Sequence, residues 1–325
     1  MKIIVIGAGN WGTTLACLLA EKNPVSLWTN TNEQAESINS KRENIKNLKG
    51  IKIPENVTAN LKFSEKINDE DIVLIAVPSS KVRSVTRELK KVLKKQIIVT
   101  ASKGFEHTSF KTISEIISEE IPSSPVIVLS GPNIAREVAE GKPTKTVLAS
   151  TDIASAARVA KVFKNTYLTF EICSDIKGVE LCAALKGIIA IGVGISEGLE
   201  LGKNFTGLIM TYGLREFKEI SEFLGISEKT IYGIAGMGDL IATCLSTNSR
   251  NWRFGNLIGK GKDRDSALKE VGMVVEGIQM ARTIVELEDL NITIPLFNII
   301  SRIIFNQNDN NNEQLIDCLM NYKAN

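Results

Sequence analysis

The first half of the chain alternates short runs of β-branched residues with stretches whose hydrophobic residues recur at helical spacing. Such alternation is typical of strand–helix–strand units around a parallel sheet, so it predicts an α/β domain. The apolar runs predict strands at Lys2–Ile6, Val25–Trp28, Ile72–Val77, Ile97–Ala101, Val126–Leu129, Lys145–Ala149 and Tyr167–Phe170. The amphipathic stretches predict helices at Trp11–Lys22, Asn32–Ser40, Lys81–Leu93, Thr112–Ile121 and Ile153–Phe163.

The second half has a different pattern. After about Cys173 the strand signals fade, and long apolar helices are predicted at Val179–Ile195, Phe205–Leu224 and Val275–Leu287. We therefore expect an α/β domain over residues 1–175 and an all-α domain over residues 176–325. The Asn-rich stretch 306–312 predicts a polar loop before a last helix.

Composition changes this picture mainly by exclusion. The 325 residues carry 39 Lys and Arg against 37 Asp and Glu, a balance too even for a nucleic-acid groove. The five cysteines are scattered and lack a Cys-x-x-Cys pair, so we expect reduced thiols, no disulfide framework and no metal site. The single histidine, His107, leaves acid–base chemistry to Lys, Asp or Glu.

We also expect no signal peptide and no membrane span. The uncharged run up to Ala20 superficially resembles a signal peptide, but three glycines and the polar Asn10, Thr13 and Thr14 interrupt it. No other segment combines 18 or more apolar residues with an absence of charge. The sequence therefore predicts a cytoplasmic protein.

The clearest motif is Gly-Ala-Gly-Asn-Trp-Gly at 7–12, which follows a predicted strand and opens a predicted helix. In this setting Gly7 makes the tight turn, Gly9 lets the backbone approach a pyrophosphate, and Gly12 lets helix and strand pack closely. A plain glycine turn is the alternative, and the strand–helix setting favours a dinucleotide site.

The residues after the second predicted strand leave the identity of the dinucleotide open. An acidic residue there would bind the ribose 2′-hydroxyl, and an arginine would bind a 2′-phosphate. This chain has Thr29 and Asn30 after Trp28, so the choice between NAD and NADP is undetermined.

Polar residues also follow three other predicted strands, in the strings Ala-Val-Pro-Ser at 76–79, Ala-Ser-Lys-Gly at 101–104 and Ser-Gly-Pro-Asn-Ile-Ala at 130–135. Ligands of doubly wound sheets bind outside the carboxyl ends of the strands, so we expect Lys103 at the ligand crevice. The alternatives are a strand-terminal lysine that is only solvated and a Gly-Pro turn that only caps a helix.

Lys186 lies inside the apolar helix 179–195, whose other charged residue is Glu180. A helix that is apolar on nearly all faces is buried, and a lysine is rarely buried without a partner. Burial near other cations suits a lysine to proton transfer. The alternative is a lysine that extends to the surface.

Two further strings carry polar groups at predicted helix starts. The string Gly-Met-Gly-Asp-Leu-Ile-Ala-Thr at 236–243 places Asp239 at a predicted N-cap, with Thr243 one turn later on the same face. The string Ser-Arg-Asn at 249–251 offers a guanidinium and two polar side chains, which suit a phosphate. Each string alone is equally typical of an ordinary capped helix.

Together these stretches resemble the NAD(P)-dependent glycerol-3-phosphate dehydrogenases of bacterial type. The matching strings are collinear over almost the whole chain: Gly-Ala-Gly-Asn-Trp-Gly-Thr at 7–13, Ser-Lys-Gly at 102–104, Ser-Gly-Pro-Asn-Ile-Ala at 130–135, Gly-Val-Glu-Leu-Cys at 178–182, Ala-Leu-Lys at 184–186, Gly-Met-Gly-Asp-Leu at 236–240, Thr-Cys at 243–244, Ser-Arg-Asn at 249–251 and Val-Val-Glu-Gly at 274–277. The resemblance implies an N-terminal Rossmann-like, doubly wound, mostly parallel sheet that binds NAD or NADP, followed by an all-α C-terminal domain that binds the substrate.

The resemblance also implies the site residues. The catalytic groups are Lys186, as proton donor and acceptor, with Lys103, Asp239 and Thr243. The substrate contacts Lys103, Gly131, Asn133, Lys186, Asp239, Ser249, Arg250 and Asn251. The cofactor contacts Gly7, Gly9, Asn10, Trp11, Gly12, Asn30, Pro78, Lys103, Ala135, Arg250, Val274 and Glu276.

Two positions depart from the family's pattern. The residue after the catalytic lysine is usually Asn, but here it is Gly187, so one polar substrate contact is lost or supplied elsewhere. Position 133 is usually Ser or Thr, and Asn133 can still donate and accept hydrogen bonds.

The implied activity is the reduction of dihydroxyacetone phosphate to sn-glycerol 3-phosphate for glycerophospholipid synthesis. Hydride passes from the nicotinamide to the ketone carbon while the ammonium of Lys186 protonates the developing alkoxide. Asp239 orients Lys186, and Arg250 anchors the phosphate. We expect a homodimer that acts on a small molecule, with no nucleic-acid or membrane partner.

Two other functions stay open. A β-hydroxyacid dehydrogenase of the same architecture differs little at the cofactor end and acts on a carboxylate; the Ser-Arg-Asn and Gly-Met-Gly-Asp strings favour a phosphate substrate instead. A non-catalytic protein that senses the cofactor needs none of Lys103, Lys186, Asp239 and Thr243, so their joint presence counts against it.

Overall fold

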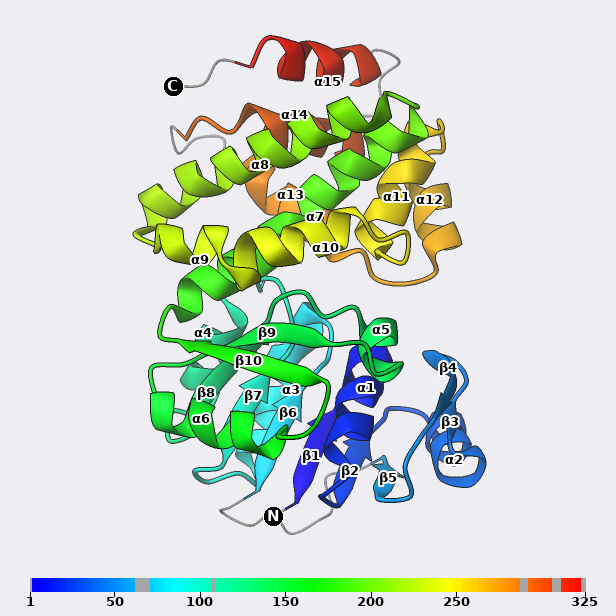
Figure 1. Ribbon diagram of the computed structural model, residues 1–325, viewed down its shortest axis with the longest axis vertical. Helices are drawn as coiled ribbons and strands as arrows, with labels where there is room; N and C mark the ends of the chain where they lie inside the picture. The colour runs from blue at the N-terminus through cyan, green and yellow to red at the C-terminus, as the bar shows by residue number, and fades with distance from the viewer. Residues whose placement is uncertain (1, 62–70, 107–108, 287–291, 306–310, 323–325) are drawn as a thin grey trace. The chain divides into compact units, whose positions relative to one another are not determined.

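The computed structural model describes residues 2–61, 71–106, 109–286, 292–305 and 311–322. The chain forms two compact units, Met1–Ile176 (unit 1) and Lys177–Asn325 (unit 2), shown in Figure 1. Three sequence predictions fall wholly or partly outside the described residues: His107, the end of the predicted helix at Leu287, and the polar loop 306–312.

Unit 1 is built on an eight-stranded sheet with the order β10-β9-β8-β7-β6-β1-β2-β5. The strands are β1 (Ile3–Ile6), β2 (Val25–Trp28), β5 (Val57–Asn60), β6 (Ile72–Ile75), β7 (Ile97–Thr100), β8 (Val126–Ser130), β9 (Thr144–Ala149) and β10 (Leu168–Cys173). Neighbouring strands pair in parallel except β8 and β9, which are antiparallel. The predicted mostly parallel sheet is confirmed.

The helices of unit 1 lie between the strands along the chain (Figure 1). They are α1 (Asn10–Leu19), α2 (Asn32–Lys41), α3 (Ser79–Lys90), α4 (Ile113–Glu120), α5 (Ala135–Ala139) and α6 (Ile153–Val162). A small antiparallel pair, β3 (Glu43–Asn44) and β4 (Leu48–Lys52), stands apart from the main sheet.

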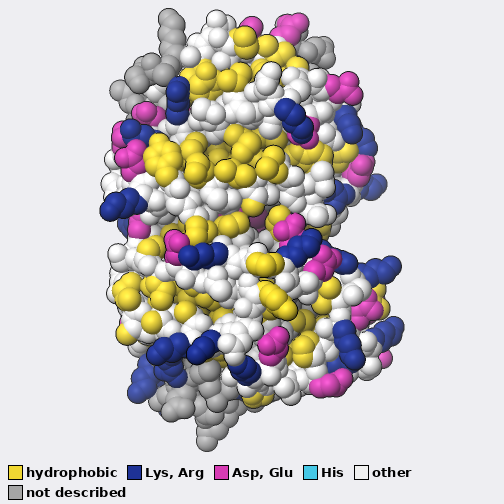
Figure 2. Space-filling view, viewed as in Figure 1, with side chains coloured by type: hydrophobic (Ala, Val, Ile, Leu, Met, Phe, Trp, Pro, Cys, Tyr) yellow, Lys and Arg dark blue, Asp and Glu magenta, His cyan; other side chains and the backbone are white. Residues whose placement is uncertain are grey.

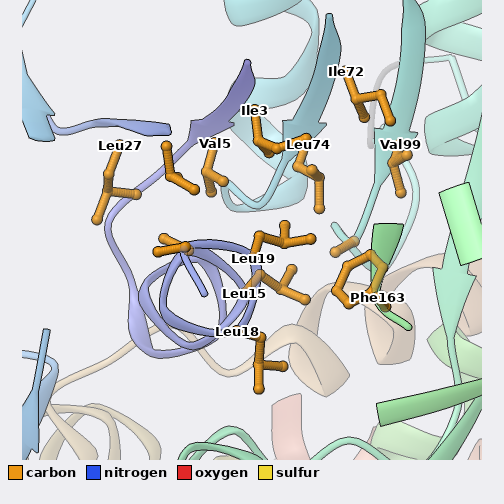
Figure 3. Close-up of a cluster of buried hydrophobic side chains, with 14 of the residues drawn as sticks. Ile3, Val5, Leu15, Leu18, Leu19, Leu27, Ile72, Leu74, Val99 and Phe163 are labelled. Atoms are coloured by element: carbon orange, nitrogen blue, oxygen red, sulfur yellow. The ribbon is translucent and has the colours of Figure 1, made fainter. Parts of the chain in front are cut away.

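Apolar side chains cover both faces of the sheet, because successive residues of a strand point to opposite faces. Ile3 and Val5 pack in one cluster with Leu15 of α1 (Figure 3), whereas Ile4 and Ile6 pack in a second cluster with residues of α3 and α4. Strands buried on both faces are continuous apolar runs, which is why the sequence predicts β1 and β6 so clearly.

The strand order reverses at β1, since the chain forms β2 and β5 on one side and then crosses to form β6, β7 and β8 on the other. Because β1, β6, β7 and β8 run in parallel, the segments that follow them leave the sheet at one edge. These segments begin at Gly7, Ala76, Ala101 and Gly131. Such a reversal is where doubly wound sheets bind ligands.

Three short strands were not predicted: β3, β4 and β5. In β5, buried Val57 and Ala59 alternate with exposed Thr58 and half-buried Asn60, so the strand has only two apolar positions. Edge strands of this length leave almost no hydrophobic pattern. The antiparallel direction of β9 is likewise set by tertiary pairing, and no local residue signals it.

Unit 2 is helical throughout its described residues. The helices are α7 (Ile176–Gly198), α8 (Gly202–Leu224), α9 (Glu228–Tyr232), the π-helical turn η1 (Ile234–Gly238), α10 (Asp239–Cys244), α11 (Arg250–Gly259), α12 (Arg264–Val271), α13 (Glu276–Glu286), α14 (Pro295–Phe305) and α15 (Asn311–Met320). The three long helices predicted from the sequence correspond to α7, α8 and α13.

Helix α7 is buried on every face from Gly178 to Ser196, as its pattern predicts. By length and composition it is the one helix of the described residues that could cross a membrane, yet the whole of its most apolar window is buried inside the protein. Complete burial of this kind is typical of a core helix.

A buried carboxyl group joins two helices of unit 2 to a residue that follows a third. Glu216 of α8 accepts hydrogen bonds from the backbone N–H groups of Leu296 (2.7 Å) and Phe297 (2.8 Å) in the first turn of α14, and from the hydroxyl of Tyr322 (3.1 Å). The first-turn N–H groups of a helix lack partners within it, so Glu216 acts as a cap from another helix. Burial nevertheless raises the pKa of Glu216 to about 7.

We expect part of the unfolding free energy to be lost as the pH rises from about 4.5 to about 7, because Glu216 binds its proton more tightly in the folded state than in the unfolded chain. The loss from this group is on the order of 3 kcal/mol. Urea unfolding at several pH values measures it. Glu216→Gln should lack that part of the slope, whereas Glu222→Gln, an exposed control on the same helix, should keep it; equal slopes in all three proteins would contradict the assignment.

Candidate functional site

The turn between β1 and α1 has the geometry that its three glycines predict. Gly7 has a φ of +106°, and a Cβ there would lie 2.6 Å from the carbonyl oxygen of Ala76. A Cβ on Gly12 would lie 1.9 Å from the carbonyl oxygen of Gly7. At Gly9 a Cβ would meet nothing within 4 Å. The first two glycines therefore serve backbone packing, and Gly9 faces open space at the start of the helix.

Three amide side chains hold this turn in place. The carbonyl oxygen of Ala8 accepts hydrogen bonds from Gln34 Nε2 (2.8 Å), Asn44 Nδ2 (2.9 Å) and Asn47 Nδ2 (3.0 Å). Sequence reasoning missed all three residues, because an amide side chain carries no local sign of a partner up to 39 residues away.

The start of α1 can accept an anion. Its N-cap is Gly9, which has no side chain to accept from the first-turn N–H groups. The indole Nε1 of Trp11 is buried and has no hydrogen-bond partner among the described residues. The hydroxyl of Thr14 donates to the carbonyl oxygen of Ala135 (3.1 Å), which brings this predicted cofactor residue beside α1. The residues present therefore fit a dinucleotide.

Asn30 is exposed just after the carboxyl end of β2, at the position where the ribose of a dinucleotide is bound in this fold. Pro78 is exposed after β6 and forms the N-cap of α3. Neither residue carries a charge, so this end of the site favours neither a 2′-hydroxyl nor a 2′-phosphate.

Lys103, Gly131 and Asn133 come together where the neighbouring strands β7 and β8 end. The Nζ of Lys103 donates to Asn133 Oδ1 (3.1 Å), and Asn133 Nδ2 is buried without a partner among the described residues. Gly131 has a φ of +141°, and a Cβ there would lie 2.5 Å from Thr146 Oγ1, so only glycine fits. A buried donor with nothing to bind costs free energy, which favours a ligand oxygen here.

An ion-pair network fixes the segment that follows Lys103. Arg83 of α3 donates two hydrogen bonds to Glu106 (2.6 and 2.7 Å) and also pairs with Glu119 and Glu120 of α4. The bonds from Arg83 lower the pKa of Glu106 to about 2, so this carboxylate stays ionised across the neutral range. Sequence reasoning did not identify Arg83 or Glu106.

In unit 2 the central feature is a buried ion pair. The Nζ of Lys186 lies 2.5 Å from Asp239 Oδ2, with 9% and 3% of the two side chains exposed. Lys186 is thus buried with a partner, and it does not extend to the surface. Burial raises the pKa of the nearby Cys244 thiol to about 12, so this thiol stays neutral and Asp239 is the anion that faces the ammonium.

The prediction that Asp239 is an N-cap is wrong. Gly238 precedes α10, and both residues have right-handed helical backbone angles because η1 runs directly into the helix. The carboxylate of Asp239 instead pairs with Lys186. Thr243 does lie on the same face, and its hydroxyl donates to the carbonyl oxygen of Asp239 (2.6 Å). π-helical turns often occur at functional sites. The extra residue per turn in η1 changes the direction in which the following Asp239 side chain points.

The starts of α11 and α13 are joined by a side chain. Ser249 is the N-cap of α11, where its hydroxyl accepts from the N–H of Trp252 (3.3 Å), and Arg250 is exposed beside it. Asn251 Oδ1 accepts from the N–H of Gly277 (3.0 Å) in the first turn of α13. The predicted cofactor residues Val274 and Glu276 lie just before and at this start.

The predicted residues therefore form one cluster in each unit. In unit 1 the cluster lies at the carboxyl edge of the sheet and contains Gly7, Gly9, Asn10, Trp11, Gly12, Asn30, Pro78, Lys103, Gly131, Asn133 and Ala135. In unit 2 it contains Lys186, Asp239, Thr243, Ser249, Arg250, Asn251, Val274 and Glu276. Within the described residues, no group of three or more His, Cys, Asp or Glu is arranged to hold a metal ion.

A glycine turn open to an anion at the edge of a doubly wound sheet, and a helical unit that buries a lysine–carboxylate pair, define a nicotinamide-dependent oxidoreductase. A model of the NAD-dependent glycerol-3-phosphate dehydrogenase N-terminus matches residues 2–156, and one of the C-terminus matches residues 175–314. The chain belongs to this family, as its motifs predict, and its cofactor is NAD or NADP.

Individual relatives agree with the family. The glycerol-3-phosphate dehydrogenase (NAD(P)+) of Enterococcus faecalis is 41% identical over 314 residues, which cover 95% of this chain and 92% of the relative. The crystal structure of glycerol-3-phosphate dehydrogenase from Coxiella burnetii has a TM-score of 0.91 at 30% identity and covers 98% of both chains. The Saccharomyces cerevisiae enzyme has a TM-score of 0.83 at 29% identity, over 97% of this chain and 99% of the other.

We expect Gly9→Ala to fold normally and to bind NADH at least tenfold more weakly, because the new methyl group meets no protein atom but occupies the approach to the α1 N-terminus. Fluorescence titration with NADH measures the affinity, and thermal unfolding measures the fold. Gly207→Ala, whose Cβ also meets nothing within 4 Å, is the matched control on α8. Unchanged NADH affinity in Gly9→Ala would remove the turn from the cofactor site.

Proposed function

We propose that this chain reduces dihydroxyacetone phosphate to sn-glycerol 3-phosphate with NADH or NADPH, in the direction that supplies glycerophospholipid synthesis. The observation that carries the proposal is the buried Lys186–Asp239 pair, in which the ammonium lies 2.5 Å from the carboxylate. The family membership and the printed name of the relatives support the same substrate.

Lys186 is the proton donor in this proposal. An ammonium that is buried and paired can give a proton to an oxygen whose charge develops in the transition state, and its positive charge stabilises that oxygen. Asp239 orients the ammonium, and Thr243 holds Asp239 through its backbone. When bound, the nicotinamide supplies the hydride.

Charged and amide groups make the proposed contacts with the substrate. Lys103, Gly131 and Asn133 contact its oxygens, and the unpartnered Nδ2 of Asn133 is a donor ready for one of them. Ser249, Arg250 and Asn251 bind the phosphate, since a guanidinium at a helix start combines charge with free N–H groups. Unit 1 carries the nucleotide-binding turn, and unit 2 carries the proton donor and the phosphate-binding residues.

We also propose a cytoplasmic homodimer. On the face in Figure 2, hydrophobic side chains gather over α8, α9 and α10. The hydrophobic residues of these elements and η1 that are at least 38% exposed are Phe223, Leu224, Tyr232, Met237 and Ile241, and the exposed Leu245 directly follows α10. An exposed apolar surface of this kind is typical of contact with another protein chain.

The direct test is the loss of absorbance of NADH and of NADPH, each with dihydroxyacetone phosphate. We expect turnover with at least one of them, and the ratio of the two kcat/KM values gives the cofactor preference. A panel of β-hydroxyacids runs in parallel. Turnover of a carboxylate substrate alone would replace the proposal with the β-hydroxyacid dehydrogenase, and no turnover in cofactor-bound protein would favour a sensor.

We expect Lys186→Met to lower kcat by about 10²- to 10⁴-fold, because it removes the proton donor and keeps an apolar side chain of similar length. Asp239→Asn should lower kcat less, since the ammonium remains. Lys177→Met, an exposed lysine of the same helix, should match the parent enzyme. Steady-state kinetics measures kcat, and a parallel NADH titration shows whether each variant binds the cofactor. A normal kcat in Lys186→Met protein that binds NADH would contradict the assignment of Lys186 as the proton donor.

A further inference from the structure

The helices α7, α11 and α13 of unit 2 meet at a point where their main chains are in close contact. A Cβ on Gly187 of α7 would lie 2.9 Å from Gly277 Cα and 3.2 Å from Asn251 Nδ2. In return, a Cβ on Gly277 would lie 2.7 Å from the carbonyl oxygen of Gly187. Real Cβ atoms do not approach other atoms so closely, so no side chain fits on either glycine unless a helix moves.

Asn251 completes this contact with a hydrogen bond. The N–H of Gly277 belongs to the first turn of α13, where helical N–H groups lack partners, and the preceding Val275 has no polar side chain to cap it. Asn251 Oδ1 accepts from that N–H at 3.0 Å. Only the oxygen of the amide can accept, so the bond fixes which way the amide points and turns its Nδ2 toward Gly187.

Further close contacts between α7 and α11 fix the position of one helix against the other. A Cβ on Gly255 of α11 would lie 2.0 Å from the carbonyl oxygen of Ile191, and a Cβ on Gly259 would lie 2.3 Å from that of Ile195. Backbone atoms, unlike side chains, cannot change rotamer to relieve a contact. The spacing between α7 and α11 is therefore set by the main chain itself.

Each residue of this junction (Gly187, Asn251 and Gly277) follows directly after a residue with a proposed chemical role. Gly187 follows Lys186, Asn251 follows Arg250, and Gly277 follows Glu276. Locking the three junction residues together thus also constrains the backbone positions of Lys186, Arg250 and Glu276, which belong to three different helices.

We propose that the junction is a positioning device for the reaction, with Asn251 as a positioning residue through its bond to Gly277 in addition to any contact with the substrate. Gly187 is required because the amide of Asn251 and the backbone of Gly277 fill the space that a side chain at 187 would need. The inference rests on the proposed function, because its kinetic test measures the turnover of dihydroxyacetone phosphate. A displacement of about 1 Å in a reacting group can lower the rate about 100-fold, so small shifts of α13 matter.

The first experiment compares Gly187→Ala with Gly207→Ala, a helical glycine whose Cβ would meet nothing. In folded Gly187→Ala we expect kcat for dihydroxyacetone phosphate to fall about 10- to 100-fold, with a displaced pH profile, because the methyl group moves Gly277 and Asn251 away from Lys186. Gly207→Ala should stay within about twofold. If Gly187→Ala loses only thermal stability and keeps its kcat and pH profile, the junction is merely structural and the inference fails.

The second experiment needs no substrate and covers the case in which Gly187→Ala does not fold. Asn251→Asp keeps an acceptor for the N–H of Gly277, and Asn251→Leu does not. We expect Asn251→Leu to bind NADH about tenfold more weakly and Asn251→Asp to stay within about threefold of the parent, measured by fluorescence titration. Equal losses in both variants overturn the inference. If the parent enzyme is inactive, the proposed function is rejected. If the parent is active, Gly187→Ala keeps its kcat and pH profile, and the two Asn251 variants bind NADH equally well, only the role of the junction is rejected.

Discussion

The buried pair of Lys186 and Asp239 is the constraint around which unit 2 is organised. Taking two charges out of water costs several kcal/mol per ion, and the cost is offset only when the geometry of the pair is good. The other buried charged residue of α7, Glu180, lies six residues before Lys186, and the carboxylate that pairs with the ammonium comes from Asp239 instead. Asp239 lies at the start of α10, directly after η1, and α7 packs backbone to backbone against α11 and α13.

Much of the fold was predictable because burial leaves a pattern in the sequence. Strands such as β1 and β6, buried on both faces, are continuous β-branched runs, and α7 is apolar around its whole circumference. The features that were missed depend on pairing between distant segments. The edge strand β5 has only two apolar positions, and the direction of β9 depends on its pairing with β8. No residue of η1 indicates that its backbone forms a π-helical turn.

The site divides in the same way. Gly7, Gly9 and Gly12 were assigned distinct roles from spacing alone, because backbone geometry at a turn is a local property. The string at 236–243 predicts Asp239 at a helix N-cap, because aspartate is a favoured N-cap residue. Its partner Lys186 lies 53 residues earlier, so the string alone does not reveal the ion pair. Arg83 and Glu106 lie on different elements and meet only in the folded chain. Sequence identifies groups by type, and tertiary structure decides their partners.

The carboxyl of Glu216 has a consequence for how unit 2 unfolds. It binds the start of α14 and the hydroxyl of Tyr322, residues 80 and 106 positions further along the chain. The ring of Tyr322 also stacks on Tyr212, 4.1 Å between centroids, one turn before Glu216 on α8. Tyr322 is therefore attached to α8 as well as to its neighbours in the chain. Local fraying from the C-terminus would expose a buried carboxyl, so these segments form one cooperative block that opens together.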